Sequence, residues 1–424
     1  MKNWILIFFT GIIVSFYLFP FEFTFLKGIN TKIMLAAVGV PIMLWHLIRM
    51  QSLLFSKEVL MGSFLAIIFS IACFFATDYN NTDDYSYATY IVSMWVWLLA
   101  AYTCITLISI VHGYIDFRLL VFYLMAVCAV QCILALVIDF NDNVKQIVDQ
   151  YVSVGGLTEF LNERKRLYGI GAALDFAGGR FSAVLIMAGY LLAHDTRVKE
   201  KKSSIYLLFL SFFIISVVGN MIARSTSVGM LMGLGYLFFI TGFWQANKMF
   251  QNFKIWEVIL LTLMVFIPTV VYLYNNIPEI YNLLRFAFEG FFKFVETGSW
   301  KTDSTDLLMT MYVFPETLKT WVIGDGLFNG PDSSFYMETD VGYLRFIFYA
   351  GLIGLFLFIV YFIYLTIGLG QRFPYLRGLF LLFLVLTFVN WLKVSTDSFL
   401  MYSLFLAMGS PYIFTNYYKT PDRL

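Results

Sequence analysis

Hydrophobic residues dominate this chain in long runs that are separated by short polar stretches. Crossing about 30 Å of hydrocarbon requires roughly 20 apolar residues in a helix. About twelve runs approach that length: 3–20, 31–48, 59–76, 87–111, 118–140, 180–194, 205–222, 226–243, 256–274, 341–366, 377–393 and 398–416. The pattern predicts an all-α polytopic membrane protein, with about 12 transmembrane helices in a single integral membrane domain over residues 1–424.

Composition supports this class and excludes others. The 424 residues are 60% hydrophobic and 13% charged, whereas soluble domains carry roughly 25% charged residues. A net charge of +1 gives no basic surface for nucleic acid. The four cysteines lie inside apolar runs without the spacing of a disulfide framework or a metal site. We therefore expect no metal and no other cofactor. No cleavage site follows the first run, so we expect it to be a retained span.

Lysine and arginine positions predict the orientation. Short connections after the even-numbered runs are basic and include Arg49, Lys57, the segment "TRVKEKK" (196–202), Lys248, Lys254, Arg372 and Arg377. Short connections on the other side are acidic, as at Asp78, Asp83 and Asp84. Because basic residues concentrate in cytoplasmic loops, this distribution predicts that the N- and C-termini are both cytoplasmic.

Two connections on the outer side are long, at residues 141–179 and 275–340. The second contains "YNLLRFAFEGFFKFVETGSW", in which Arg285, Glu289, Lys293 and Glu296 share one helical stripe and phenylalanines cover most of the rest. The opposite charges four residues apart favour helix pairs of Arg285 with Glu289 and of Glu289 with Lys293. This stretch predicts an amphipathic helix along the outer membrane surface, followed by a second helix near 305–320.

Arginines gather at the predicted outer boundary. Arg224 lies in a very short hairpin within "GNMIARSTSVGMLMG", and Arg166, Arg180 and Arg345 fall at the same level. A cation in a short outer loop opposes the usual bias. Guanidinium groups match phosphate oxygens, so the cluster indicates a shared anion such as a lipid-linked pyrophosphate. The alternative is that each arginine snorkels or pairs with an acid such as Asp175 or Asp340.

Three stretches resemble a known family. The segment "GDGLFNGPDSSFYMETDVGYLRFIFYAGLIGLFLFIV" resembles the signature of the O-antigen polymerase and ligase superfamily (Wzy and WaaL type proteins). "ARSTSVGMLMGLGYLF" is similar to its arginine hairpin before a glycine-rich span, and "RLYGIGAALDFAGGRFSAVLIMAGYLL" is similar to its earlier passage from loop to span. The resemblance covers residues 166–360 and the arrangement of the loops.

The resemblance implies a glycosyltransferase in the bacterial inner (plasma) membrane. Its substrate would be a glycan on an undecaprenyl pyrophosphate carrier, held at the outer face without a required metal. A polymerase passes the growing chain to the next lipid-linked repeat unit of an O antigen, capsule or exopolysaccharide, and a chain-length regulator protein would be a further partner. A ligase passes the finished chain to lipid A-core.

Matched positions assign candidate roles. Arg224 fills the hairpin arginine role and Arg180 that of the loop-to-span arginine. Asp340 stands where ligases resemble one another in carrying a histidine. The only histidines here, His46, His112 and His194, map to the cytoplasmic side, which favours a polymerase.

Catalysis would need a base for the acceptor hydroxyl and positive charge for the departing pyrophosphate. Asp340 is our candidate base, with Asp175, Asp332 and Glu338 as rivals, and its structural alternative is a helix N-cap. The candidate substrate-binding residues are Arg166, Arg345, Tyr343, Asp175 and Tyr168. The two tyrosines would stack on sugars or, alternatively, belong to the interfacial belt.

Other functions stay open on the sequence. A flippase or other transporter for lipid-linked oligosaccharide would have a similar number of spans, but it should carry ionisable groups at mid-depth, where this chain is almost uncharged. A different polyprenyl-dependent glycosyltransferase would be favoured by paired acids in a large first outer loop, and here that loop is only "FEFTFLKGIN".

Overall fold

A computed structural model describes residues 4–50, 55–153, 158–163, 166–242, 244–300, 302–330 and 335–419. The chain divides into two compact units, and each is described by itself. The first unit comprises residues 1–35, 104–298 and 416–424, and the second comprises residues 36–103 and 299–415.

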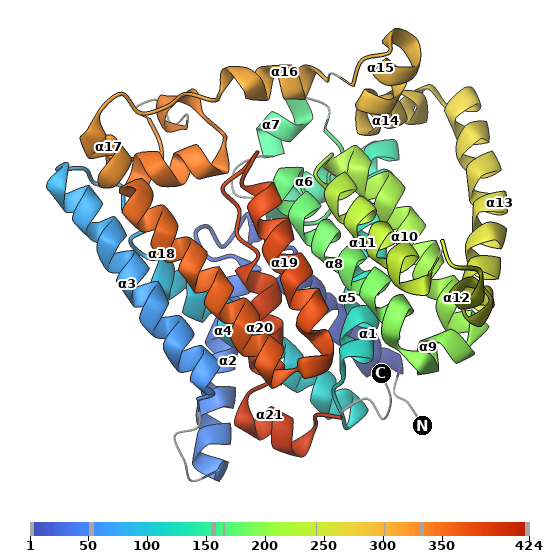
Figure 1. The fold of residues 1–424 in the computed structure, drawn as a ribbon, viewed down its shortest axis with the longest axis horizontal. Helices are drawn as coiled ribbons and strands as arrows, with labels where there is room; N and C mark the ends of the chain where they lie inside the picture. The colour runs from blue at the N-terminus through green and yellow to red at the C-terminus, as the bar shows by residue number, and fades with distance from the viewer. Residues whose placement is uncertain are drawn as a thin grey trace. The chain divides into compact units, whose positions relative to one another are not determined.

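Helices make up nearly all of the described structure (Figure 1). In chain order the elements are α1 (Trp4–Leu18), β1 (Glu22–Phe23), α2 (Thr31–Met50), α3 (Lys57–Tyr79), α4 (Tyr90–His112), α5 (Phe117–Phe140), α6 (Asp142–Tyr151), β2 (Val152–Ser153), α7 (Thr158–Glu163), α8 (Leu174–His194), α9 (Thr196–Glu200), α10 (Lys202–Ile222), α11 (Thr226–Thr241), α12 (Ala246–Gln251), α13 (Phe253–Asn276), α14 (Pro278–Ala287), α15 (Glu289–Thr297), α16 (Asp303–Thr310), α17 (Leu318–Val322), η1 (Tyr336–Glu338), α18 (Gly342–Arg372), η2 (Pro374–Leu376), α19 (Arg377–Asn390), α20 (Phe399–Met408) and α21 (Pro411–Asn416).

Within the described ranges, eight helices are long and apolar enough to cross a membrane, namely α2, α3, α4, α5, α8, α10, α13 and α18. Shorter apolar helices cover the other expected runs, at Trp4–Leu18, Thr226–Thr241, Pro374–Asn390 and Phe399–Met408. These helices make the protein an all-α, multi-pass membrane protein. The number of twelve crossings and the side on which each terminus lies stay predictions.

Small residues bring α8 and α11 together in the first unit, and both belong to the group of green helices in Figure 1. A Cβ atom built on Gly229 would lie 2.0 Å from the Cα of Ser182, and one on Gly189 would lie 2.5 Å from the carbonyl oxygen of Gly233. Backbones approach this closely only where side chains are absent, as in other membrane helix pairs. The contact fixes the start of α11, which follows the turn that contains Arg224, against α8.

The first long outer connection is folded. Strands β1 and β2 pair antiparallel, with Glu22 opposite Ser153 and Phe23 opposite Val152. Helix α8 begins at Leu174, six residues before the expected start of its apolar run. Asp175 and Arg180 therefore both lie on α8, since the less apolar segment "LDFAGG" continues the helix.

In the second unit, α18 packs along α3, seen as the orange and blue helices in Figure 1. Phe69 stacks on Phe358 with ring centroids 4.5 Å apart. Helix α18 is kinked at Gly351, where φ is 64° and ψ is −171°. A Cβ on Gly351 would lie 2.1 Å from the carbonyl oxygen of Val322, so glycine permits both the kink and the close approach of α17.

Two expectations for the second outer connection are corrected. The single amphipathic helix expected over 281–300 is two helices, α14 and α15, separated at Phe288 with φ −116° and ψ 31°. Gly290 lies two residues after Phe288, and its low helix propensity favours a break near this point. The helix expected near 305–320 is also two helices, α16 and α17. Pro315 lies between them and disfavours a continuous helix.

Candidate functional site

The hairpin between α10 and α11 is closed by its own polar side chains. The Thr226 hydroxyl donates to the carbonyl oxygen of Gly219 at 3.0 Å, and the Ser227 hydroxyl donates to the Asn220 amide oxygen at 2.7 Å. These bonds satisfy backbone and side-chain groups at two helix ends. Arg224 projects from this fixed turn with 21% of its side chain exposed.

Two of the predicted arginines converge on one aromatic ring. The guanidinium carbon of Arg224 lies 4.1 Å from the ring centroid of Phe286 on α14. The guanidinium carbon of Arg166 lies 4.3 Å from the same centroid. Cation–π attraction holds each guanidinium at the ring. The structure thus brings together two cations that are far apart in the sequence.

Glu289, the first residue of α15, forms an ion pair with Arg224. Its Oε2 atom lies 2.6 Å from Nη1 of Arg224, and its Oε1 atom lies 2.9 Å from Nζ of Lys293. The expected pair of Glu289 with Lys293 is therefore formed. Arg285 pairs instead with Glu296, through Nη2 and Oε2 at 3.2 Å. Phe286 and Glu289 were predicted as surface residues of an amphipathic helix, and no local pattern identified them as partners of Arg224.

Asp175 and Arg180 occupy the first turns of α8. The Ser225 hydroxyl donates to Oδ1 of Asp175 at 2.9 Å, which ties α8 to the residue following Arg224. The guanidinium carbon of Arg180 lies 6.0 Å from the ring centroid of Phe19. Asp175 thus contacts the hairpin, and Arg180 lies beside the loop that follows α1.

Tyr168 is buried, with 5% of its surface exposed. Its hydroxyl donates to Oδ1 of Asp149 at 2.7 Å and to the Asn162 amide oxygen at 3.2 Å. Burial raises the pKa of the Tyr168 hydroxyl, and the bond to Asp149 raises it further. Tyr168 therefore links helix α6, which contains Asp149, to helix α7, which contains Asn162.

In the second unit Arg345 is enclosed by aromatic rings. Its guanidinium carbon lies 3.6 Å from the ring centroid of Phe328 and 3.7 Å from that of Phe335. Nη2 donates to the carbonyl oxygen of Phe328 at 3.3 Å, and Nη1 lies 3.8 Å from Oδ1 of Asp340. Only 5% of the Arg345 side chain is exposed, against 29% for Asp340. Arg345 and Asp340 therefore form a second charged pair, with the acid on the more open side.

Tyr343 is the second residue of α18 and lies about two turns before the kink at Gly351. Its backbone N–H donates to the carbonyl oxygen of Trp391 at 3.1 Å, and its hydroxyl donates to the carbonyl oxygen of Phe388 at 3.0 Å. The Tyr343 and Trp391 rings meet edge to face. These contacts join the start of α18 to the end of α19.

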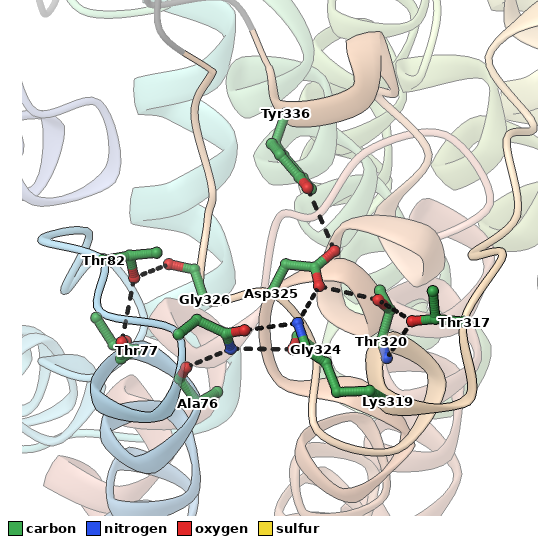
Figure 2. Close-up of polar contacts among 11 residues, drawn as sticks. Ala76, Thr77, Thr82, Thr317, Lys319, Thr320, Gly324, Asp325, Gly326 and Tyr336 are labelled. Atoms are coloured by element: carbon green, nitrogen blue, oxygen red, sulfur yellow. Dashed lines mark hydrogen bonds and ion pairs between the residues drawn. The ribbon is translucent and has the colours of Figure 1, made fainter.

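The loop before Arg345 is held by a polar network centred on Asp325 (Figure 2). Oδ1 of Asp325 accepts hydrogen bonds from Nζ of Lys319 at 2.6 Å and from the Thr320 hydroxyl at 2.9 Å. Oδ2 accepts from the Tyr336 hydroxyl at 3.3 Å. Nζ of Lys319 also donates to the side-chain oxygen of Asn80 at the end of α3. The network fixes the segment that carries Phe328 and Phe335.

Asp84 holds the same segment from the other side. Its Oδ2 atom accepts backbone N–H bonds from Phe328 at 2.7 Å and Asn329 at 3.1 Å, and Oδ1 accepts from Ser86. Burial alone would raise the pKa of the Asp84 carboxyl, but these hydrogen bonds outweigh it and lower the pKa below its usual value. The ionised form of Asp84 is therefore the one that stabilises the loop.

Asp332 and Glu338 are the remaining candidates for the base. Asp332 lies outside the described residues. Arg164 and Lys165, the two basic residues directly before Arg166, also lie outside them. Glu338 has a positive φ of 53°, and Met337 before it has a φ of 55°. Two consecutive non-glycine residues in this region form a sharp turn, which directs the chain into the start of α18.

Within the described ranges, no group of three His, Cys, Asp or Glu side chains gathers closely enough to hold a metal ion. No protein-family model, curated protein or solved structure matches the chain. The helices define an all-α, multi-pass membrane protein, and its two arginine-containing polar sites lie in different units.

Proposed function

We propose that this protein is a polysaccharide polymerase of the bacterial inner membrane. It transfers a growing glycan from an undecaprenyl pyrophosphate carrier to a lipid-linked repeat unit at the outer face. The convergence of Arg166 and Arg224 on Phe286 carries this proposal. Two guanidinium groups held at one ring offer several donors to the oxygens of a diphosphate. A bilayer surface is where a lipid-linked diphosphate presents that charge.

The reaction needs little beyond a base and charge compensation. The acceptor hydroxyl attacks the anomeric carbon of the donor glycan, a carboxylate takes the hydroxyl proton, and the bond to the carrier diphosphate breaks. In this scheme Arg166 and Arg224 stabilise the charge on the departing diphosphate, and Arg180 is kept as a further candidate cation. Asp340 stays the candidate base that the sequence indicates, and its side chain is the more exposed member of its pair with Arg345. The topology expected from the sequence, with twelve spans and cytoplasmic termini, would put these residues at the outer face.

One observation favours a transporter of lipid-linked oligosaccharide as the alternative. Asp397, between α19 and α20, interacts electrostatically with the hydroxyls of Tyr90 and Tyr361. Both tyrosines are buried, with 6% and 0% of their surfaces exposed. Polar groups inside a helical membrane unit are a feature of transport pathways. A ligase is the third possibility and differs from the polymerase only in its acceptor.

Disrupting the gene and separating the surface polysaccharide on a gel distinguishes the three functions. Loss of a polymerase leaves single repeat units attached to the lipid core or carrier. Loss of a ligase leaves long chains on the carrier, and loss of a flippase leaves single repeats inside the cell. Either of the last two patterns would refute the proposal.

Complementation with point variants tests the site. Arg224→Ala and Asp340→Asn proteins that insert normally should make little or no polymer. Arg285→Ala is the matched control, because it removes an arginine of α14 that pairs with Glu296 rather than with Arg224's partner Glu289. Normal polymer from both site variants would remove these residues from the mechanism.

A further inference from the structure

Helices α14 and α15 are held to the first unit in different ways. Helix α14 buries Ile280, Leu284 and Ala287 and packs on α10 and α13. Helix α15 has no buried residue, and its main helix contact is α14. Elements with few buried apolar contacts open at the lowest free energy. Helix α14 is thus the anchored part and α15 the releasable part, with the non-helical Phe288 between them.

Charged contacts hold α15 in place. Glu289 binds Arg224 at 2.6 Å and Lys293 at 2.9 Å, and only 14% of its side chain is exposed. Further along α15, Glu296 pairs with Arg285 and the Phe292 ring stacks on Tyr274. The guanidinium of Arg224, which we assign to a diphosphate, is therefore already paired with the carboxylate of Glu289.

We propose that Glu289 is an internal competitor for Arg224, and that α15 is a lid which a lipid diphosphate displaces. This inference rests on the proposed function. A carboxylate and a diphosphate cannot share one guanidinium without like-charge repulsion. When Glu289 leaves, α15 turns at Phe288. Phe286 keeps its place because α14 remains packed, so both guanidinium groups keep their contact with its ring.

The bond between Glu289 and Arg224 lowers the affinity of the site for every ligand that must replace it. The apparent affinity is the intrinsic affinity multiplied by the fraction of the protein in which α15 is displaced, so each such ligand is weakened by the same factor. A diphosphate carries more charge than a monophosphate and contacts both Arg166 and Arg224, so its intrinsic affinity is the higher of the two. The diphosphate therefore displaces α15 at the lower ligand concentration.

Binding of farnesyl diphosphate to the full chain in nanodiscs tests the inference. Glu289→Gln should bind the probe about tenfold more tightly than the wild type, since the amide has no charge to compete. Glu279→Gln is the matched control, because it makes the same change on α14, the anchored helix, and leaves the charged contacts of α15 in place. It should bind as the wild type does. Farnesyl monophosphate should gain from Glu289→Gln by about the same factor as the diphosphate, because both replace the same bond.

The outcomes separate this inference from the proposed function. If Arg224→Ala loses binding while Glu289→Gln is unchanged or weaker, the lid is refuted and the arginine site stands. If Arg224→Ala binds as the wild type does, the arginine site itself is refuted. Inorganic pyrophosphate provides a further arm, and an affinity equal to that of farnesyl diphosphate would overturn the assignment of a lipid ligand.

Hydrogen exchange on the wild-type protein tests the movement without a variant. Farnesyl diphosphate should increase deuterium uptake in residues 289–297 and leave residues 278–287 unchanged. Uptake in 289–297 that stays constant or falls at saturating probe would overturn the displacement of α15, whether or not Glu289→Gln folds.

Discussion

The contact between α8 and α11 predicts a large difference between two glycines of the same helix. A Cβ added at Gly229 would lie 2.0 Å from Cα, 2.5 Å from C and 2.4 Å from O of Ser182. All three are backbone atoms that cannot rotate away. A Cβ added at Gly235 would meet nothing within 4 Å. Gly229→Ala should therefore destabilise the protein, and Gly235→Ala should not.

The magnitude follows from the geometry. Relieving the overlap at Gly229 requires the helices to separate locally by about 1 Å, and overpacking of this kind costs about 1–3 kcal/mol. Separation also lengthens two hydrogen bonds of the Ser182 hydroxyl, which accepts from the N–H of Gly229 at 3.1 Å and donates to the carbonyl oxygen of Ser225 at 2.9 Å. Each contributes about 0.5–1.5 kcal/mol. The expected loss is about 3 kcal/mol.

Thermal and denaturant unfolding of the purified variants in one detergent measures this difference. Gly229→Ala should melt several degrees below the wild type, while Gly235→Ala should melt at or slightly above it, because alanine favours a helix over glycine. The Gly229 variant should also lose polymer synthesis, since Ser225 precedes α11 and holds Asp175. Equal melting temperatures for the two variants would refute the close approach of α8 and α11.

Three further predictions concern the second unit. Arg345→Lys should lower the free energy of unfolding by about 2 kcal/mol, because an ammonium cannot stack between two rings as the guanidinium does at Phe328; an unchanged unfolding curve would contradict this packing. Asp325→Ala removes the acceptor for Lys319 and should lower the free energy of unfolding by about 2 kcal/mol. This value already includes a reduction for the exposure of the lysine. Limited proteolysis should then cut the loop faster than in the wild type. Asp84 has a lowered pKa, so its stabilisation is present above the ordinary aspartate value of about 3.9 and is lost as the pH falls through the lower folded value. Asp84→Asn should therefore flatten the acid limb of a plot of melting temperature against pH, and parallel wild-type and variant limbs would count against the role of Asp84.

Some contacts of the candidate sites could be predicted from the sequence. The i,i+4 spacing predicted the pair of Glu289 with Lys293, which is formed. The alternative that arginines pair with nearby acids holds for Arg345 with Asp340. The contact of Arg224 with Glu289 was not predicted, because the two residues lie on separate helices and neither local spacing nor periodicity links them.

The sequence alone determined the membrane class and the position of nearly every long helix. Both depend on local hydrophobicity, and a run of about 20 apolar residues has few other stable solutions in a bilayer. It also located Arg224 in a hairpin, since the polar residues around position 224 separate the two apolar runs 205–222 and 226–243. The tertiary structure decided the break at Phe288, the kink at Gly351, and the placing of Arg166 and Arg224 on one ring. Those features arise from contacts between segments far apart in the chain, where packing and backbone approach, rather than local pattern, set the free energy.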